Sequence, residues 1–497
     1  MKRKDNKMMH NETTKSVRHG LFSLGILTLS ILTMFPACTD EDKGASAPVD
    51  FSDAPISFST DVIDTQATRT TSGTIDDLDA LKALPEGFGV MGYLTDEDSR
   101  DSEDTPTPDF MYNQQVRWGA LYTTTDEKGK AVNVEDWIYA PAKYWPNTTN
   151  NAAARYISFF AYAPFVEILN SSDGSTGQTA GITTLTNNAD KRPFLVYQLD
   201  ETAGTVQADI LWAEPCIDAT RNGNGLIYFK DSKEMWQKVP LSFHHALAAV
   251  EVYVQRVYDE PTSSEKRPEA EQHTKLFVSQ LQFQTTNSAA SGLYSSGRLN
   301  LETGEWTSPT GADAWPIGDA TLTFSETNFN STVRGTTSET LGAIRENELN
   351  KWAEGGTYDS ETKKWTWDPK SDFGVDEEER LLFADKAITL LPSRGNITIS
   401  PTLTYSMITR DDELLLSTLT DKDGHKYSRI VNTVTGNPLK LTLEAGKKYK
   451  LVIRIGVEHV EFEVVSVVDW DFPMRFNPAI GSDFKDETII DHTLNED

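Results

Sequence analysis

The chain of 497 residues contains only two cysteines, Cys38 and Cys216. If Cys38 is chemically modified, Cys216 has no disulfide partner, and an exported chain of this size must then be stabilised by its apolar cores. Cys216 lies in WAEPCID, where no arrangement of histidine with Asn or Asp would activate it as a nucleophile. We therefore expect Cys216 to be a small buried apolar residue.

Basic residues are also few, because 46 Lys and Arg stand against 75 Asp and Glu, which gives a net charge of −29. Counted from Cys38, the loss of six basic and two acidic residues leaves 40 against 73, a net charge of −33. Neutralising phosphates requires clustered Lys and Arg, so this balance argues against binding to nucleic acid. It is typical of a soluble surface that resists non-specific association.

Catalytic and metal-binding motifs are absent, since the chain has no GxSxG, no glycine-rich phosphate loop and no HExxH. His244 and His245 are adjacent, so on a strand they would point to opposite faces and could not share a metal ion. DKDG at 421–424 lacks the later ligands of a calcium loop and is a better hairpin turn. The acidic run VDEEER at 375–380 is expected to be a solvated surface. The sequence thus predicts no enzyme and no cofactor.

Only one long apolar run is present, the uncharged residues 21–37, and Lys2, Arg3, Lys4, Lys7, Lys15 and Arg18 precede it. A basic region followed by an apolar region and a small residue is the layout of a secretory signal peptide. The run is at the lower limit for a membrane-spanning helix, and Pro36 would end such a helix. We therefore predict a signal peptide over residues 1–37.

Ala37-Cys38 resembles a bacterial lipobox, in which the signal is cut before a cysteine that becomes lipid-modified. Phe35 and Pro36 depart from the usual residues of that motif. Each buried methylene of an acyl chain contributes about 0.8 kcal/mol to membrane binding, so several chains at Cys38 would anchor the protein. The acidic residues 40–42 resemble a tag for the outer face of the outer membrane. The alternative is an ordinary cysteine beside an ordinary cleavage site.

After a polar tether over residues 38–54, the chain has a β pattern nearly throughout. ISFSTDVI places Ile56, Phe58 and Val62 on one face, as in a half-buried strand. Similar segments follow as far as Trp470, separated by turn residues. They predict an all-β fold of two antiparallel sandwich domains, residues 55–310 and 311–470, with a C-terminal extension over 471–497. A polar insertion over 327–378 includes a short helix predicted to begin at Ser338.

Aromatic residues are dense between residues 137 and 165. They can either pack in a sandwich core or form an exposed platform for a glycan. The residues are Trp137, Tyr139, Tyr144, Trp145, Phe159, Phe160, Tyr162 and Phe165.

Several segments, taken in order, resemble the fimbrillin family of outer-surface lipoproteins that supply subunits of type V pili. The segments span about residues 55–470 and are ISFS followed by ATRT, FGVMGY, YWP, FFAYAP, ADILWA, LSFHHALAAVEVYV, SGRLNLETGEW, LLPS, AGKKYKLVIRIG and VSVVDW. The resemblance implies two transthyretin-like β-sandwich domains in tandem. It also implies a location at the outer membrane or in a fimbrium, with other pilus subunits as partners.

The resemblance further implies assembly by strand exchange. An arginine-specific protease removes the N-terminal segment with its first strand, and a strand of the next subunit fills the vacated groove. The matching cleavage site here is Arg69-Thr70, and the displaced strand would contain Ile56, Phe58 and Val62. The donor strand would lie in TIIDHTL, where Ile490 and Leu494 share one face with His492.

The long polar insertion distinguishes the chain from a minimal stalk subunit, so stalk, anchor and tip roles all stay open. The main alternative to a pilus component is a surface lipoprotein that binds glycans or another receptor through its aromatic residues.

Overall fold

The computed structural model describes residues 55–62, 75, 77–95, 110–125, 129–146, 156–167, 181–186, 192–199, 209–221, 226–229, 235–257, 274–311, 314–334, 356–359, 364–367, 374–375, 378–384, 387–410, 419–420, 424, 426–456 and 460–470. The chain divides into two compact units, Met1–Val49 and Asp50–Asp497, and these residues all belong to the second. The predicted signal peptide, lipidation site and tether lie outside the described residues. Among the residues described, no helix has the length and apolar character needed to cross a membrane.

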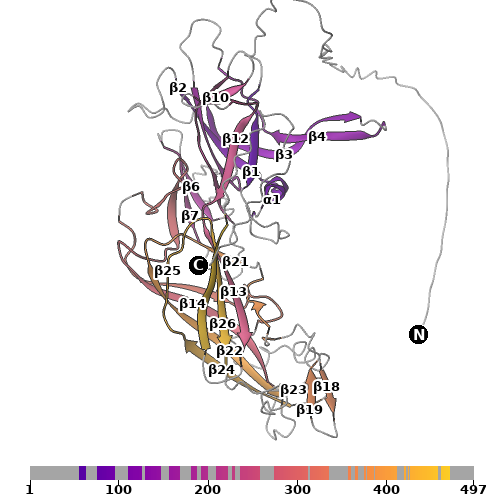
Figure 1. The fold of residues 1–497 in the computed structure, drawn as a ribbon, viewed down its shortest axis with the longest axis vertical. Helices are drawn as coiled ribbons and strands as arrows, with labels where there is room; N and C mark the ends of the chain where they lie inside the picture. The colour runs from indigo at the N-terminus through magenta and orange to yellow at the C-terminus, as the bar shows by residue number, and fades with distance from the viewer. Residues whose placement is uncertain are drawn as a thin grey trace, which may run out of the picture. The chain divides into compact units, whose positions relative to one another are not determined.

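The prediction of an all-β fold is confirmed (Figure 1). Most strand pairs are antiparallel. The single helix in the described part of the chain is α1 (Leu78–Ala83), which begins where the side chain of Asp77 accepts a 2.7 Å hydrogen bond from the backbone N–H of Ala80. The transthyretin-like detail of the fold stays a prediction.

The first sheet contains the N-terminal strands. Its main path runs in the order β1 (Phe58–Val62), β12 (Val239–His245), β8 (Leu211–Ala213), β5 (Tyr156–Ala163), β2 (Phe88–Thr95), β3 (Met111–Thr125) and β4 (Ala131–Ile138). Beside this path lie β9 (Cys216–Arg221), β10 (Ile227–Phe229) and β11 (Met235–Trp236).

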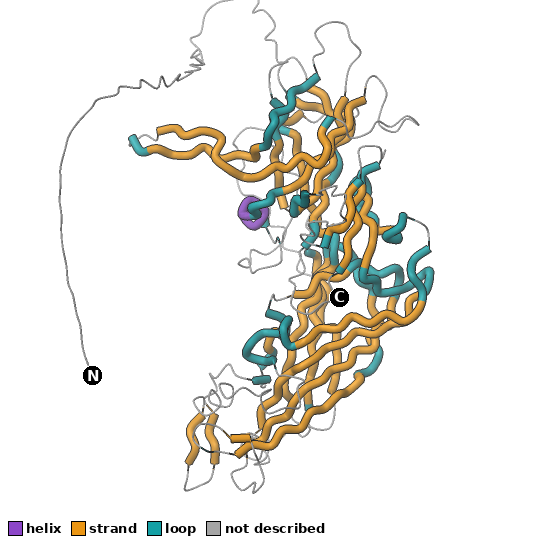
Figure 2. Tube along the Cα trace, turned by 180° about the vertical axis from the view of Figure 1, so that it is seen from behind, coloured by secondary structure: helices purple, strands orange, loops and turns teal. Residues whose placement is uncertain are grey.

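In the described part of the chain, four further sheets contain the other strands, and Figure 2 shows the strands in orange. One has β20 (Arg380–Leu381), β13 (Ala248–Arg256), β26 (Lys447–Ile455), β27 (Val460–Asp469) and β21 (Ala387–Leu390). A second has β17 (Gly318–Ser325), β14 (Thr274–Asn287), β22 (Ile397–Arg410), β24 (Lys426–Thr435), β23 (Leu419–Thr420) and β25 (Leu439–Leu441). The smaller ones have β16 (Trp306–Thr307), β15 (Ser296–Asn300), β7 (Phe194–Gln198) and β6 (Ile182–Leu185), and β18 (Gly356–Asp359) with β19 (Lys364–Trp367).

Two apolar clusters meet at β2 and β5, because both strands are buried on both faces. Val90 and Phe159 belong to one cluster, whereas the alternate residues Met91 and Phe160 belong to the other. Successive side chains of a strand point to opposite faces, so a single layer of sheet separates the two cores. Such strands have near-continuous apolar sequences, as FGVMGYL and YISFFAYA do.

The strands on either side of residue 310 are joined in the same sheets. β14, before this position, pairs with β17 and β22 after it, and β13 pairs with β26. The domain boundary near residue 310 stays a prediction, and these pairs are the ladders that would cross it. Of the predicted insertion over 327–378, the described residues include the β18–β19 hairpin, while the helix predicted at Ser338 lies outside them.

Candidate functional site

The first strand, β1, lies at the edge of its sheet and runs parallel to β12 (Figure 1). The register pairs Phe58 with Val239 at one end and Val62 with Phe243 at the other. The backbone N–H of Val239 donates a 2.9 Å hydrogen bond to the carbonyl oxygen of Ser57. The first strand of the chain is therefore held by a ladder to a strand that is distant in sequence.

Residues 139–143 contact the segment just before β1. The N–H of Ile56 donates a 2.8 Å hydrogen bond to the carbonyl oxygen of Lys143, and the Tyr139 hydroxyl donates to the Ile56 carbonyl oxygen at 2.9 Å. Burial is the main cause that raises the pKa of Tyr139. We call the space between β12 and residues 139–145, which β1 occupies, the β1 slot.

Two side chains of β1 and its flank fill the slot. Ile56 is 1% exposed and Phe58 is 0% exposed. The Phe58 ring packs edge to face against Phe88 and Phe159, with centroids 6.3 and 5.7 Å apart, and lies 5.8 Å from the ring of Tyr139. Burial of an apolar side chain of this size contributes about 1.5–3 kcal/mol, so β1 contributes substantially to this core.

The other candidate residues of strand exchange and anchoring lie outside the described part of the chain. They are Ala37, Cys38, Arg69, Thr70, Ile490 and Leu494. For Val62, the structure gives the backbone position on β1 but not the surroundings of its side chain. The roles of all these residues stay predictions.

A buried polar cluster contains Ile75, which follows the predicted cleavage site in the sequence. The N–H of Ile75 donates a 3.2 Å hydrogen bond to the Asp209 carboxylate, and His245 Nδ1 lies 2.8 Å from the same oxygen. The His245 ring stacks on Trp470 with centroids 3.6 Å apart. This cluster fixes Ile75 and the end of β12 beside Trp470, the last described residue. Sequence reasoning missed it, because these residues come from four separate segments.

His244 and His245 lie in different surroundings. His244 Nε2 is 3.3 Å from a Glu214 carboxylate oxygen and its ring stacks on Trp212, whereas His245 belongs to the cluster with Asp209. In the described part of the chain, no group of three or more His, Cys, Asp or Glu is placed to bind a metal ion. Cys216 is buried, and its Sγ lies 2.7 Å from the carbonyl oxygen of Pro240. The expectation of a packed thiol is thus confirmed.

Most of the aromatic residues between positions 137 and 165 belong to the core. Trp137, Trp145, Phe159, Phe160 and Tyr162 are at most 6% exposed. Tyr139 and Phe165 are partly buried, and Tyr144 has 50% of its surface exposed. Within the described residues of this stretch, the density of rings is therefore explained by packing rather than by a continuous glycan platform.

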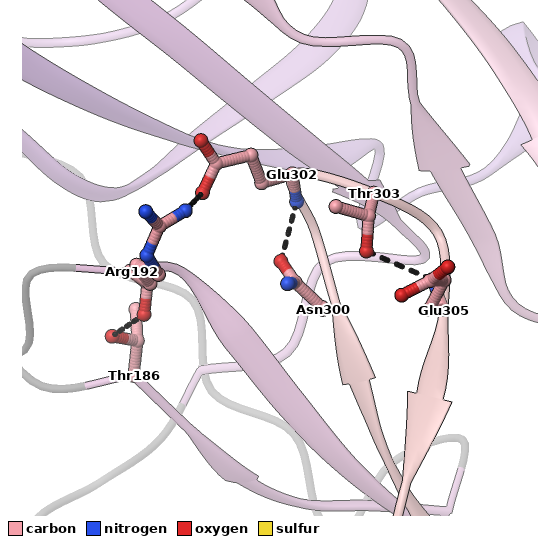
Figure 3. Close-up of polar contacts among 6 residues, drawn as sticks. All are labelled: Thr186, Arg192, Asn300, Glu302, Thr303 and Glu305. Carbon is pink, nitrogen blue, oxygen red and sulfur yellow. Dashed lines mark hydrogen bonds and ion pairs between the residues drawn. The ribbon is translucent and has the colours of Figure 1, made fainter. Parts of the chain in front are cut away.

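A small acidic turn joins β15 to β16 (Figure 3). Arg192 forms a 2.6 Å ion pair with Glu302, whose N–H donates a 2.9 Å hydrogen bond to the side chain of Asn300. The Arg192 side chain is 62% exposed, and an ion pair this exposed contributes little to stability. The arginine neutralises Glu302, so the turn is better explained as local structure than as a cation site.

Comparison with known proteins gives similarities among solved structures. No protein-family model and no curated protein matches the chain. A fimbrial protein from Bacteroides vulgatus is 20% identical with a TM-score of 0.49, and the match covers 84% of this chain and 99% of that one. A candidate cell adhesion protein from Bacteroides ovatus is 12% identical with a TM-score of 0.35, covering 84% and 99%. Fimbrial and cell adhesion proteins, to which the resemblance in the sequence pointed, are thus among the similar structures.

Proposed function

We propose that this chain is a non-enzymatic, fimbrillin-like surface protein that serves as a pilus or adhesion component. The observation that carries the proposal is the β1 slot, in which an edge strand is inserted between β12 and residues 139–145 with Ile56 and Phe58 in the core. Ladder hydrogen bonds use backbone groups, so a strand of another chain with suitable apolar residues can occupy the same position.

The position of Arg69 supports a cleavage step. β1 ends at Val62, while Ile75 is held by Asp209, so both sides of the intervening segment are attached to the body of the protein. A cut after Arg69 would leave β1 bound by non-covalent contacts only. It would also separate the mature chain from Cys38, the proposed lipid anchor at the outer membrane.

The proposed partner is another pilus subunit, with TIIDHTL as the donor strand. Ile490 and Leu494 are four residues apart, as Phe58 and Val62 are, so they would take the positions that these two residues of β1 occupy in the uncut chain. An exposed sheet edge with an apolar groove favours such replacement, because both backbone and side-chain contacts are regained.

The test is the intact mass and N-terminal sequence of the native protein recovered from the cell surface, compared with Arg69→Ala and with Arg100→Ala as a matched control. We expect the native chain and Arg100→Ala to begin at Thr70 and to form polymers. Arg69→Ala should begin at an acylated Cys38 and remain unassembled. A native chain that begins at Cys38 would contradict strand exchange and favour an anchor, or a glycan-binding lipoprotein that a glycan array would identify.

A further inference from the structure

The last described residue, Trp470, is fixed beside the end of β12. Its side chain is 0% exposed, and its ring stacks on the imidazole ring of His245 with centroids 3.6 Å apart. The N–H of Trp470 donates a 2.6 Å hydrogen bond to the carbonyl oxygen of Gly446, whose own N–H donates to the Leu247 carbonyl oxygen at 3.0 Å. Side chain and backbone are both held, so the residues that follow Trp470 leave the body of the protein at a defined point.

A buried carboxylate fixes the position of His245. Asp209 Oδ2 lies 2.8 Å from His245 Nδ1, and the side chains of both residues are 0% exposed. The same oxygen accepts a 3.2 Å hydrogen bond from the N–H of Ile75. Separating the partners of a buried pair is strongly destabilising, so this cluster holds the exit point of the C-terminal extension against β12.

This exit point lies close to one end of the β1 slot. β1 pairs with β12 as far as Phe243, and His245 follows two residues later. Side chains two residues apart on a strand point to the same face, so Trp470 stacks on the face where Phe243 shares an apolar cluster with Phe58. With a rise of about 3.3 Å per residue and the 3.6 Å stack, the exit lies roughly 10–15 Å from the Phe243 end of the slot.

The chain beyond Trp470 is long enough to return to this slot. Residues 471–487 separate Trp470 from the candidate donor strand TIIDHTL, which begins at Thr488. A chain of this length without fixed structure has an end-to-end distance of about 20–25 Å, which exceeds the distance to be spanned. Such a linker gives an effective concentration in the millimolar range. At micromolar protein, the extension of the same chain therefore reaches the slot more readily than the extension of another chain.

Entry from this end fixes the direction of the strand. A segment that starts beside Phe243 and runs toward Val239 is antiparallel to β12, whereas β1 is parallel to it. Antiparallel ladders are slightly more stable per residue than parallel ones. Ile490 would then lie level with Phe243 and Leu494 level with Val239, at the two ends of the present β1 ladder.

We propose that, once β1 has left, the slot is closed by the C-terminal extension of the same chain until another subunit replaces it. The inference rests on the proposed function, because β1 leaves only when the chain is cut after Arg69. The closed state is replaceable, since Glu496 then lies level with the buried Ile56, and a carboxylate fills an apolar position poorly. A chain closed on itself covers the edge of β12, so assembly waits for an encounter with another subunit.

The first experiment introduces Ser242→Cys and Asp491→Cys together, which lie opposite each other in this register. The background carries Cys38→Ala and Cys216→Ala, so that no other thiol is present. The uncut chain is diluted to about 10 μM, cut after Arg69, separated from its N-terminal fragment and exposed to a mild oxidant. We expect a disulfide within one chain, seen as monomer on a non-reducing gel and as the loss of two hydrogens in the intact mass.

The matched control adds Arg69→Ala to the same cysteine pair. In that chain β1 stays in the slot, where Asp61 lies opposite position 242. Because the extension cannot then pair with β12, the control should oxidise at least about tenfold less than the cut chain.

The form of the disulfide separates the possibilities. A ladder of disulfide-linked chains would overturn closure within one chain and leave strand exchange between subunits standing. If the cut chain forms no disulfide, closure is wrong, whereas polymers of the native chain would still support the proposed function. A native protein that begins at Cys38 would contradict the proposed function, while the disulfide in the chain cut in vitro still decides whether the extension fits its own slot.

The second experiment compares Ile490→Asp with Ile489→Asp in the cut chain. The two substitutions add the same charge at adjacent positions, which face opposite sides of a strand. We expect Ile490→Asp to speed hydrogen exchange of the β12 amides between Val239 and Phe243 at least about tenfold, because an unpaired charge is not buried in an apolar cluster. Ile489→Asp should change these rates less than about twofold, as surface substitutions usually do. Circular dichroism confirms that both variants fold, and equal exchange rates would contradict the proposed closure.

Discussion

Phe58 is completely buried although it lies on an edge strand. Its ring contacts Phe88, Tyr139 and Phe159, which come from three separate parts of the chain. The alternation in ISFSTDVI predicted which side of the strand is apolar, but not these partners. The neighbouring residues Ser57 and Ser59 are only partly buried, so among residues 56–59 the fully buried side chains are those of Ile56 and Phe58.

Phe58→Ala is expected to weaken the docking of β1 by about 3–5 kcal/mol of free energy, since it deletes a fully buried aromatic ring. The measurement is hydrogen exchange at Val239, whose N–H donates to the β1 ladder. Ser59→Ala is the control and should leave this exchange rate nearly unchanged. Equal protection in both variants would show that the aromatic contacts do not hold β1.

Tyr253 offers a test at high pH. Burial first, and then the nearby Glu251 and Glu379 carboxylates, raise its pKa to about 12. The neutral phenol is favoured in the folded state, so this contribution to stability is present below the usual pKa near 10 and is lost as the pH rises toward 12. The thermal unfolding midpoint of the native chain should therefore fall more steeply between pH 9 and about 12 than the midpoint of Tyr253→Phe. Equal slopes of the unfolding midpoint against pH for the two proteins would contradict the raised pKa of Tyr253.

At the scale of elements, the β15–β16 hairpin depends on a glycine. Gly304 has φ of +71°, and a Cβ at this position would lie 2.2 Å from the ring of Trp212 on β8. Gly129, between β3 and β4, has φ of +79° and no atom within 4 Å of the same position. The two glycines thus share a backbone conformation but differ in their surroundings.

Gly304→Ala should lower the free energy of unfolding by about 2–4 kcal/mol, since strain at positive φ is added to a clash with Trp212. Gly129→Ala should cost only about 1 kcal/mol, from the backbone conformation. Chemical denaturation of both variants measures the difference. Similar losses would mean that the contact between the hairpin and Trp212 relaxes without cost.

The positions of the strands in the sequence were more predictable than the partners with which the strands pair. Alternating segments such as ISFSTDVI and the continuous apolar YISFFAYA correspond to β1 and β5. The parallel pairing of β1 with β12 was not predicted, because pairing between distant segments depends on tertiary contacts rather than on local pattern. The exposure of the β3–β4 hairpin at Tyr122 and Val132 was not predicted either, because these residues fit the pattern of a half-buried strand. Helix α1 is only six residues long and gave too short a periodic signal.

At the scale of the compact unit, the shared layer of β2 and β5 links the two apolar clusters. Their alternate residues contribute to different cores, so loss of either core removes the support of the other. β14 adds ladders between strands before and after residue 310. The division into two domains near residue 310 stays a prediction, and the ladders of β14 would link the two domains.

We expect differential scanning calorimetry of the uncut chain to show one cooperative transition for this unit. The calorimetric and van't Hoff enthalpies should agree, as they do for two-state unfolding. A fragment of residues 55–310 should not fold by itself, because β13 and β14 would lack β26 and β22. Two separate transitions, or a stably folded fragment, would instead support independent domains divided near residue 310.

The ladder of β1 also affects how the protein reaches its native state. Its partner β12 begins at Val239, so the loop that must close before this ladder can form contains most of the first half of the chain. Contacts of such high sequence separation form slowly, whereas the hairpins between neighbouring strands form early. The hairpins around the slot can therefore form before β1 pairs with β12. In that interval the edge of β12 is unpaired, and an unpaired strand edge can pair with a strand of another chain.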